Sequence, residues 1–323
     1  MFLKQSVFKT LNEKIFEWVN CNYPWTNVYG ISRSLMALAT ALTLIFNDAS
    51  VFFRPASGIA TYPYCPKTIP SVFCFTSNDY LHLNIVRWIC VLLLLIIATG
   101  WRPRITGIIH WWICYSLQVS ALTIDGGEQV NAVFTLLLLP ITLTDSRKWH
   151  WYNNEVYDID NNGEFYARMI ALVSFVAIRV QVSILYFNSF VAKLGEEDWI
   201  NGTAVYYYSQ HLMLGFPEVI LHIFQFIITS KFVVVATWGT LLIQFLLFAA
   251  ILAPKKGWNF LFYIGLLMHD IFAIMFGLIS FSMIMCSILI LYLRPLNKPF
   301  KLKQLNLKRS LSERGDKQKI LNY

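Results

Sequence analysis

Three polar side chains in one largely apolar stretch are the first candidates for chemistry. Arg179, Tyr186 and Lys193 follow one another at intervals of seven residues within positions 165–194. Seven residues are close to two turns of an α-helix, so the three share one helix face, while Gln181 lies off that line. A polar stripe inside a membrane must face protein or a wet cavity, where a lysine can act as a base. A network that only packs helices explains the spacing equally well.

Two carboxylates flank a pair of glycines in the motif Asp125-Gly126-Gly127-Glu128. Glycines at this place allow a tight turn or a close approach of two backbones. The carboxylates are candidates for acid–base chemistry on the same side of the membrane as Lys193. A solvated surface turn is the simpler interpretation of the same residues.

Two histidines have neighbours that suit proton transfer or an interface. His269-Asp270 lies about two thirds of the way along the apolar stretch 257–276, and a His–Asp pair inside a membrane can handle protons. Hydrogen bonding between helices is the alternative role of that pair. His211 follows an aromatic run that is typical of a membrane interface. The cysteines form no CxxC pair, so no metal site is predicted.

The elements that position these side chains are membrane helices. Hydrophobic residues make up 57% of the chain and charged residues only 14%, against about 25% charged residues in a soluble domain. A membrane-spanning helix needs about 20 consecutive, mostly apolar residues. We therefore predict an all-α, polytopic integral membrane protein with about eight transmembrane helices. The predicted spans are 28–47, 82–100, 105–124, 130–145, 165–194, 231–252, 257–276 and 277–294.

The chain divides into three predicted regions. In residues 1–22 apolar side chains repeat at helical spacing between charged ones, which indicates an amphipathic interfacial helix. Residues 23–296 form the transmembrane domain, in which Pro140 is expected to interrupt the fourth span. The segment 212–230 is apolar but short, and we interpret it as re-entrant or interfacial. Residues 297–323 are a basic cytoplasmic tail.

The positions of basic residues predict the orientation. With the N-terminus inside and eight spans, the basic loops and the tail all fall in the cytoplasm, as the positive-inside rule requires. These loop residues are Arg102, Arg104, Arg147, Lys148, Lys255 and Lys256. Because the basic tail follows a membrane span, we expect it to meet anionic lipid and not nucleic acid. Both termini are then cytoplasmic, and Lys193, Glu128 and His211 lie on the outer side.

The outer loop 48–81 contains two cysteines, Cys65 and Cys74. A disulfide is permitted outside the cytoplasm, and nine residues of separation make the loop easy to close. We favour this disulfide, and two unpaired thiols are the alternative.

The residues around Lys193 resemble the core of the vitamin K-dependent γ-glutamyl carboxylase superfamily, whose bacterial members are called HTTM proteins. The matching pattern is Arg179-x-Gln181-x4-Tyr186-Phe187-x5-Lys193-Leu194, then Asp198-Trp199-x2-Gly202-x4-Tyr207-x-Ser209-x-His211, then His269 and Ile274-Met275-Phe276. The resemblance implies that Lys193 is a catalytic base, helped by burial and a nearby Arg179, with His269 and His211 as further candidates. It also implies a lipid-soluble cofactor such as a menaquinone-like quinone.

Two departures separate the chain from the carboxylases. The chain ends shortly after its last predicted span, where the carboxylases carry a large lumenal domain that holds the substrate, so substrate recognition is expected to pass to a partner. Glu128-Gln129 stands where the carboxylases have a histidine. The resemblance therefore implies a related site and not the same reaction.

Within that superfamily the chain resembles the sporulation-delaying protein B family over nearly its whole length. The matching stretches are Asn22-Tyr23-Pro24-Trp25-Thr26-Asn27, Gly100-Trp101-Arg102-Pro103-Arg104 and 120–129. This resemblance implies a bacterial plasma-membrane protein that works with a sporulation-delaying protein A-like partner. Together they would mature a secreted toxin peptide from its precursor.

Two functions fit these expectations. The first is an enzyme that modifies the toxin peptide, with Lys193 as base and Glu128, His269 and His211 as further catalytic candidates. Arg179, Gln181, Tyr186, Asp125 and Asp270 would form the supporting polar groups. The second is a non-enzymatic chaperone or exporter that presents the precursor to a partner. A transporter is less well supported, because the sequence has no visible inverted repeats.

Overall fold

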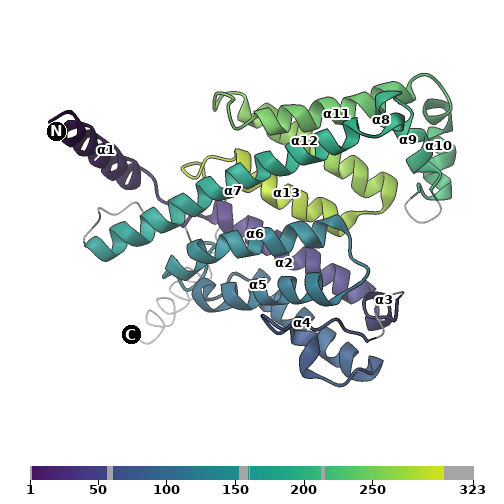
Figure 1. Cartoon of the computed structure of the whole chain (residues 1–323), viewed down its shortest axis with the longest axis horizontal. Coiled ribbons are helices and arrows are strands. Elements are labelled where there is room, and N and C mark those ends of the chain that lie inside the picture. The colour runs from purple at the N-terminus through teal and green to yellow at the C-terminus, as the bar shows by residue number, and fades with distance from the viewer. Residues whose placement is uncertain (1, 57–60, 153–158, 160, 212–214, 302–323) are drawn as a thin grey trace, which may run out of the picture.

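The computed structural model describes residues 2–56, 61–152, 159, 161–211 and 215–301, and these residues contain helices but no β-strand. The predicted tail lies outside the described residues from position 302 onward. The helices, labelled in Figure 1, are α1 Phe2–Cys21, α2 Asn27–Phe46, α3 Ala49–Phe52, η1 Val72–Phe75, α4 Tyr80–Ala98, α5 Pro103–Ser120, α6 Gly126–Thr144, α7 Asn162–Leu194, α8 Glu197–Ile200, α9 Ala204–Ser209, α10 Glu218–Ile228, α11 Val233–Ala249, α12 Trp258–Phe276 and α13 Ile279–Leu293.

Polar caps and one glycine set where several helices begin and end. Thr26, Asp79, Asp125 and Asn161 precede α2, α4, α6 and α7, and each side chain accepts a hydrogen bond from a backbone N–H of the first turn. Such caps satisfy N–H groups that have no partner inside the helix. Gly277 has φ +70°, a left-handed conformation that ends α12 and lets α13 begin two residues later. The apolar run 257–294 is therefore divided at this glycine.

Five helices in the described part of the chain are long and apolar enough to cross a membrane, namely α2, α4, α6, α7 and α12. A sixth candidate is the pair α10 and α11, which together pass the same test but are bent by 99°. The helix α13 is apolar but shorter, with 15 residues. The all-helical class and several apolar spans are confirmed, whereas the predicted number of eight crossings stays a prediction.

Two local predictions need correction or detail. Pro140 does not interrupt its helix, because α6 continues to Thr144. A proline there removes a single N–H hydrogen bond, and the packed neighbours hold the rest of the last turns. The segment expected to be re-entrant contains α10, which meets α11 at the sharp bend, while residues 212–214 lie outside the described part.

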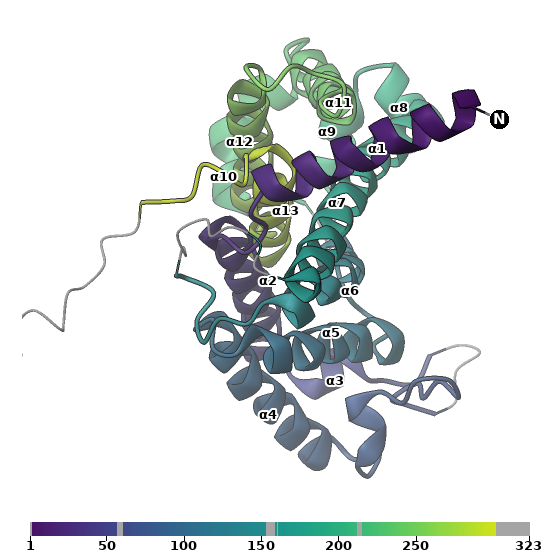
Figure 2. The ribbon, with the colours of Figure 1, turned by 90° about the vertical axis from the view of Figure 1, so that its left-hand side faces the viewer.

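The long helices form layers around α2 and α7. Figures 1 and 2 both place α4 and α5 on one side, α11 and α12 on the opposite side, and α2, α6, α7 and α13 between them. One hydrophobic core joins α2, α6, α7, α11, α12 and α13, and a second joins α2, α4, α5 and the loop with η1. The N-terminal helix α1 packs on α7, where the rings of Phe16 and Phe165 stack at 5.5 Å. The central position of α2 links the two cores.

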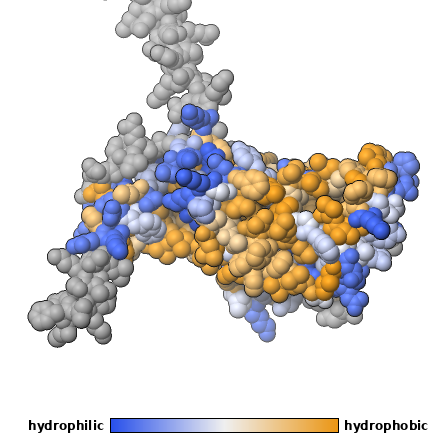
Figure 3. Space-filling model, turned by 90° about the horizontal axis from the view of Figure 1, so that it is seen from above, coloured by the Kyte–Doolittle hydropathy of each residue, from blue (hydrophilic) through white to orange (hydrophobic). Residues whose placement is uncertain are grey.

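The outer faces of the helices expose large apolar side chains, as a lipid-facing surface does. Figure 3 looks onto the side on which α11 lies, and hydrophobic side chains dominate much of that face. The exposed apolar residues of α11 and α12 on this outer surface include Trp238, Leu242, Phe245, Phe260 and Ile274. Together with the candidate spans, these residues are those of a membrane protein.

A buried ion pair fixes the segment that follows α6. The Arg147 guanidinium donates to both carboxylate oxygens of Asp145, at 2.8 Å from Nε and 2.7 Å from Nη2. Tyr29 of α2 donates to the same carboxylate, and Arg147 also donates to the carbonyl of Tyr152. Arg147 is one of the basic loop residues on which the predicted orientation rests. The neighbouring carboxylate pairs with it, and of Arg147 and Lys148 only Lys148 is exposed.

The loop between α3 and α4 is closed by a disulfide between Cys65 and Cys74, whose Cα atoms are 5.8 Å apart. The hydroxyl of Ser120, at the end of α5, donates to the carbonyl of Tyr64 at 2.8 Å. The disulfide and this hydrogen bond tie the loop to the same end of the bundle that carries the start of α6.

Candidate functional site

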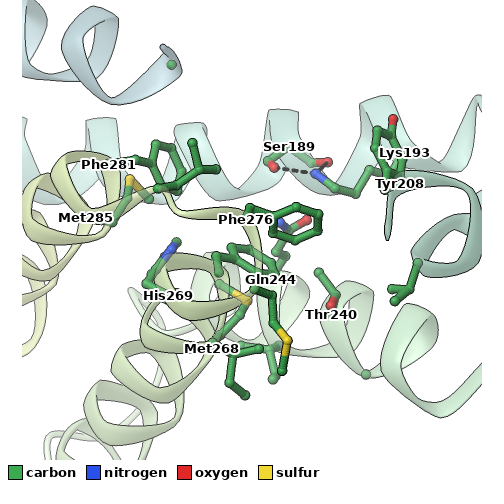
Figure 4. Close-up of a pocket in the computed structure, with 18 of the residues that line it drawn as sticks. Ser189, Lys193, Tyr208, Thr240, Gln244, Met268, His269, Phe276, Phe281 and Met285 are labelled. Atoms are coloured by element: carbon green, nitrogen blue, oxygen red, sulfur yellow. Dashed lines mark hydrogen bonds between the residues drawn. The ribbon is translucent and has the colours of Figure 1, made fainter. Parts of the chain in front are cut away.

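A cavity of about 920 Å³ lies between α6, α7, α11, α12 and α13, with residues of α8 and α9 at its rim. Most of its wall is apolar, and the few polar side chains come from different helices (Figure 4). Apolar lining residues include Leu185, Ile243, Met268, Phe272, Phe276, Phe281 and Met285. A largely apolar wall with a few fixed polar groups is typical of a small-molecule or peptide site.

Lys193 supplies the cation of the cavity. It lies in the last turn of α7, where a positive charge is favoured by the helix dipole. The half-buried ammonium donates to the carbonyl oxygen and the hydroxyl of Ser189, at 3.2 and 2.9 Å. It also lies 5.2 Å from the ring centre of Trp199. These contacts hold the side chain along the cavity wall, as Figure 4 shows.

Tyr186 and His269 form a buried polar pair that lines the same cavity. The Tyr186 hydroxyl and the His269 Nε2 are 3.0 Å apart, so one atom donates and the other accepts according to the tautomer of the imidazole. The Nδ1 atom of His269 and the Oε1 atom of Gln244 are buried and have no hydrogen-bond partner within the described chain. Both residues line the cavity, so a ligand there would find two free hydrogen-bonding atoms.

The structure separates Arg179 from this site. Its guanidinium lies 5.0 Å from the ring centre of Trp258, and neither Arg179 nor Gln181 lines the cavity. Arg179 and Lys193 are fourteen residues apart, which is roughly 21 Å along a helix. The prediction that Arg179 lies near Lys193 and acts on its charge is therefore wrong. Tyr186 and Lys193, in contrast, do line the same cavity.

Asp270 and His211 also lie outside the cavity. Asp270 follows His269 but points to another face of α12, where it is exposed and accepts a hydrogen bond of 3.5 Å from Ser282. His211 is exposed after α9, and it does not line the cavity. The predicted His269–Asp270 pair is replaced by the pair of His269 with Tyr186.

Asp125 and Glu128 belong to the first turn of α6 and not to a solvated turn. Asp125 caps the helix by accepting the N–H of Glu128 at 3.0 Å. The Glu128 side chain is fully buried and accepts a hydrogen bond of 2.7 Å from Thr40 of α2. Gly126 and Gln129 line the cavity, but Glu128 points away from it. The structure therefore places Glu128 at the same end as Lys193 without bringing the two together.

The position of Gly127 explains why the motif needs a glycine there. A Cβ atom on this residue would lie 2.8 Å from the Cα of Phe281, so α6 and α13 touch through their backbones. We expect Gly127→Ala to lower the free energy of unfolding by about 1–3 kcal/mol, because the methyl group has to push α13 away.

Gly126→Ala is the matched control, since its Cβ would meet only the end of the Phe281 ring at 3.9 Å. Thermal unfolding of both variants in detergent measures the difference. Equal stability of the two variants would show that the close approach is not needed.

Two sets of residues in the site could not be predicted from the sequence. Gln244 lies in an apolar run, and its only local signal is that it is an amide inside a predicted span. The methionines and phenylalanines of the wall have no local signal, because apolar residues of this kind are as common on lipid-facing surfaces. In the described part of the chain, no three His, Cys, Asp or Glu side chains gather into a metal-binding group.

Comparison with known proteins identifies relatives over most of the chain. The chain is 50% identical over 291 residues to the uncharacterized protein YitO of Bacillus subtilis strain 168, which covers 90% of this chain and 92% of that protein. It is 36% identical over 282 residues to the sporulation-delaying protein SdpB of the same organism, which covers 87% of this chain and 85% of that protein. No family model and no solved structure matches the chain. Identity at this level over most of both proteins confirms the family predicted from the sequence motifs, and the chain belongs to the sporulation-delaying protein B family.

Proposed function

We propose that the protein is a multi-pass plasma-membrane component that matures a secreted toxin peptide of the sporulation-delaying type by modifying its precursor in the Lys193 cavity. One observation carries the proposal: Lys193 and the Tyr186–His269 pair line the same large apolar cavity. Membership of the sporulation-delaying protein B family supports the link to such a toxin. The motif around Lys193 supports a relation to the HTTM and γ-glutamyl carboxylase-like proteins.

In this proposal Lys193 is the base and acts in its neutral amine form, which burial against the apolar wall favours over the ammonium form. It takes a proton from the bound precursor, and the Ser189 oxygens and the Trp199 ring hold the ammonium that results. His269, the partner of Tyr186, lies across the cavity from Lys193 in Figure 4, and the pair donates or accepts a hydrogen bond at the bound group. A precursor bound against the apolar wall would displace water, which would strengthen each of these electrostatic contacts.

A quinone-type cofactor of the menaquinone class fits the residues present. Its isoprenoid tail would lie against the methionines and phenylalanines. In the reduced hydroquinone form a ring hydroxyl could donate to Gln244 Oε1, and a ring oxygen could meet Nδ1 of His269, which donates or accepts according to the tautomer. When bound, such a group supplies two-electron redox chemistry.

The proposed topology has eight crossings with both termini in the cytoplasm. The cavity and the Cys65–Cys74 loop then face the outside, where a secreted precursor arrives. A sporulation-delaying protein A-like partner would bind the precursor there, while residues 1–22 lie on the inner membrane surface. Residues 23–296 form the transmembrane domain, and residues 297–323 meet anionic lipid.

A non-enzymatic chaperone or exporter is the second candidate. The observation that favours it is the position of Glu128 and Asp270, neither of which lines the cavity. The cavity wall is largely apolar, with Glu196 as the carboxylate among its lining residues, and is suited to binding an apolar peptide segment and presenting it to a partner.

Photo-crosslinking of the precursor tests both forms of the proposal. Phe276 lines the cavity. Phe260 on the same helix does not line it, and its side chain is 66% exposed on the surface of the helix bundle. With p-benzoylphenylalanine at position 276, we expect a crosslink to the co-expressed toxin precursor, and at position 260 only crosslinks to lipid. Equal capture of the precursor from both positions, or none from position 276, would remove the cavity as its binding site.

A further inference from the structure

Glu128 occupies an unusual place for a carboxyl group. It is fully buried between α6, α2 and α5, at the start of a candidate membrane span. The Thr40 hydroxyl donates a hydrogen bond to its Oε2 atom at 2.7 Å. The second carboxyl oxygen, Oε1, is buried without a partner.

No described cation forms an ion pair with Glu128. The described ion pairs of the chain involve Asp79, Asp145 and Glu164. The groups that face Glu128 are the neutral Thr40 and Thr43 hydroxyls of α2, the Cys114 thiol of α5 and the Asp125 carboxylate one turn earlier on α6. An ionised carboxylate would be buried here with another negative charge as its nearest charged neighbour. Burial of an unpaired charge is far more costly than burial of a neutral acid.

The hydrogen bonds around Glu128 run toward its carboxyl group, and a proton on that group would complete the network. Asn131 Nδ2 donates to the Thr40 hydroxyl at 2.8 Å, and this hydroxyl donates onward to Glu128. The chain of donors therefore ends on the carboxyl group. The Oδ1 atom of Asn131 is a second buried acceptor without a donor, three residues along the same face of α6. A proton on Glu128 Oε1 turns this atom into a donor, which can serve Asn131 Oδ1 directly or through one water.

We propose that Glu128 is a proton-binding site inside the membrane, a neutral carboxylic acid that closes the hydrogen-bond network between α6 and α2. The ligand is a proton, taken up from the end of the bundle where Asp125 is partly exposed and accepts a hydrogen bond of 3.3 Å from Ser280.

This proton is linked to the cavity through the first turn of α6. Gly126, Gln129 and Val130 of that turn form part of the cavity wall, while Glu128 and Asn131 face α2. Loss of the proton leaves a bare carboxylate against α2, so water has to enter or the start of α6 has to move away. Either change alters the wall next to Lys193.

Two measurements on the purified, full-length protein test the site, and neither needs the toxin precursor. In the first, dicyclohexylcarbodiimide is added, which reacts with protonated carboxyl groups in apolar surroundings, and the labelled peptide is identified by mass spectrometry. We expect label on Glu128 at mildly acidic and neutral pH and loss of that label at strongly alkaline pH. The exposed Glu218 is the control carboxylate, and we expect it to stay unlabelled.

In the second, the infrared spectrum of the wild type is compared with that of Glu128→Gln at neutral pH. The glutamine copies the shape and the donor of the neutral acid, so we expect the variant to fold. We expect the wild type to have a carboxylic-acid carbonyl band that the variant lacks. A carboxylate band assigned to Glu128 at neutral pH, or an unlabelled Glu128 in the wild type, would overturn the proposal. The labelling decides the question even where the variant fails to fold.

Discussion

Lys193→Ala is expected to lower the yield of mature toxin peptide by ~10²–10⁴-fold, the usual contribution of a positioned base. The protein itself is expected to remain folded in the membrane, because the Lys193 side chain is only half-buried and its contacts lie within α7 and the adjoining α8. The yield is measured by mass spectrometry of the culture medium, and the amount of membrane-inserted protein is measured in the same cells.

Lys193→Arg separates a base from a fixed positive charge. A guanidinium keeps the charge but does not give up its proton in proteins, so we expect a loss nearly as large as with alanine. Lys231→Ala, which removes an exposed lysine in the turn before α11, is expected to leave the yield unchanged. Full activity of Lys193→Arg would show that the site needs only a cation.

Asp145→Asn is expected to lower the free energy of unfolding by about 3–5 kcal/mol, the usual cost of removing one partner of a buried ion pair. The change keeps the size of the side chain but leaves the buried Arg147 without its bidentate carboxylate. It also removes the charged acceptor of the Tyr29 hydroxyl, which ties α2 to this segment. Unfolding in a denaturing detergent, followed by circular dichroism, measures the loss.

Two variants accompany this measurement. The double variant Asp145→Leu/Arg147→Leu is expected to regain much of the stability, because it leaves no unpaired charge. Asp79→Asn is the matched control. The pair of Asp79 with His82 is about half exposed, and asparagine caps α4 as well as aspartate does, so we expect no measurable change. A loss of stability as small for Asp145→Asn as for Asp79→Asn would contradict a structural role of the buried pair.

The fold could be predicted from composition and apolar run lengths, because those signals are local. The break at Gly277 is one example, since the apolar run 257–294 is too long for a single crossing and a glycine near its middle can take the left-handed conformation that ends a helix. The number of crossings could not be derived in the same way. Whether α10 and α11 form one bent span depends on how they pack against other helices.

The candidate site could be predicted only in part. The seven-residue spacing correctly joined Tyr186 and Lys193, but it also included Arg179, which packs on Trp258 far along the same helix. Asp270 lies about 100° further around α12 than His269 and does not line the cavity, although Met268, on the other side of His269, does. Which of two adjacent residues faces a cavity depends on the packing of the helix, and the sequence alone does not show it.

The partners of the buried polar groups lie far away in the sequence. Glu128 meets Thr40, which is 88 residues earlier, and His269 meets Tyr186, which is 83 residues earlier. No local pattern contains these contacts, and for this reason Glu128 resembled a residue of a solvated turn.

The mass of the secreted peptide tests the central claim most directly. The peptide is collected from cells that contain the wild-type protein or Lys193→Ala, together with the same precursor. If the Lys193 cavity modifies the precursor, the wild-type peptide differs in mass from its unmodified sequence, and any peptide released with Lys193→Ala lacks that difference. A wild-type peptide whose mass is explained by cleavage alone, or an identical modification with Lys193→Ala, would contradict the account.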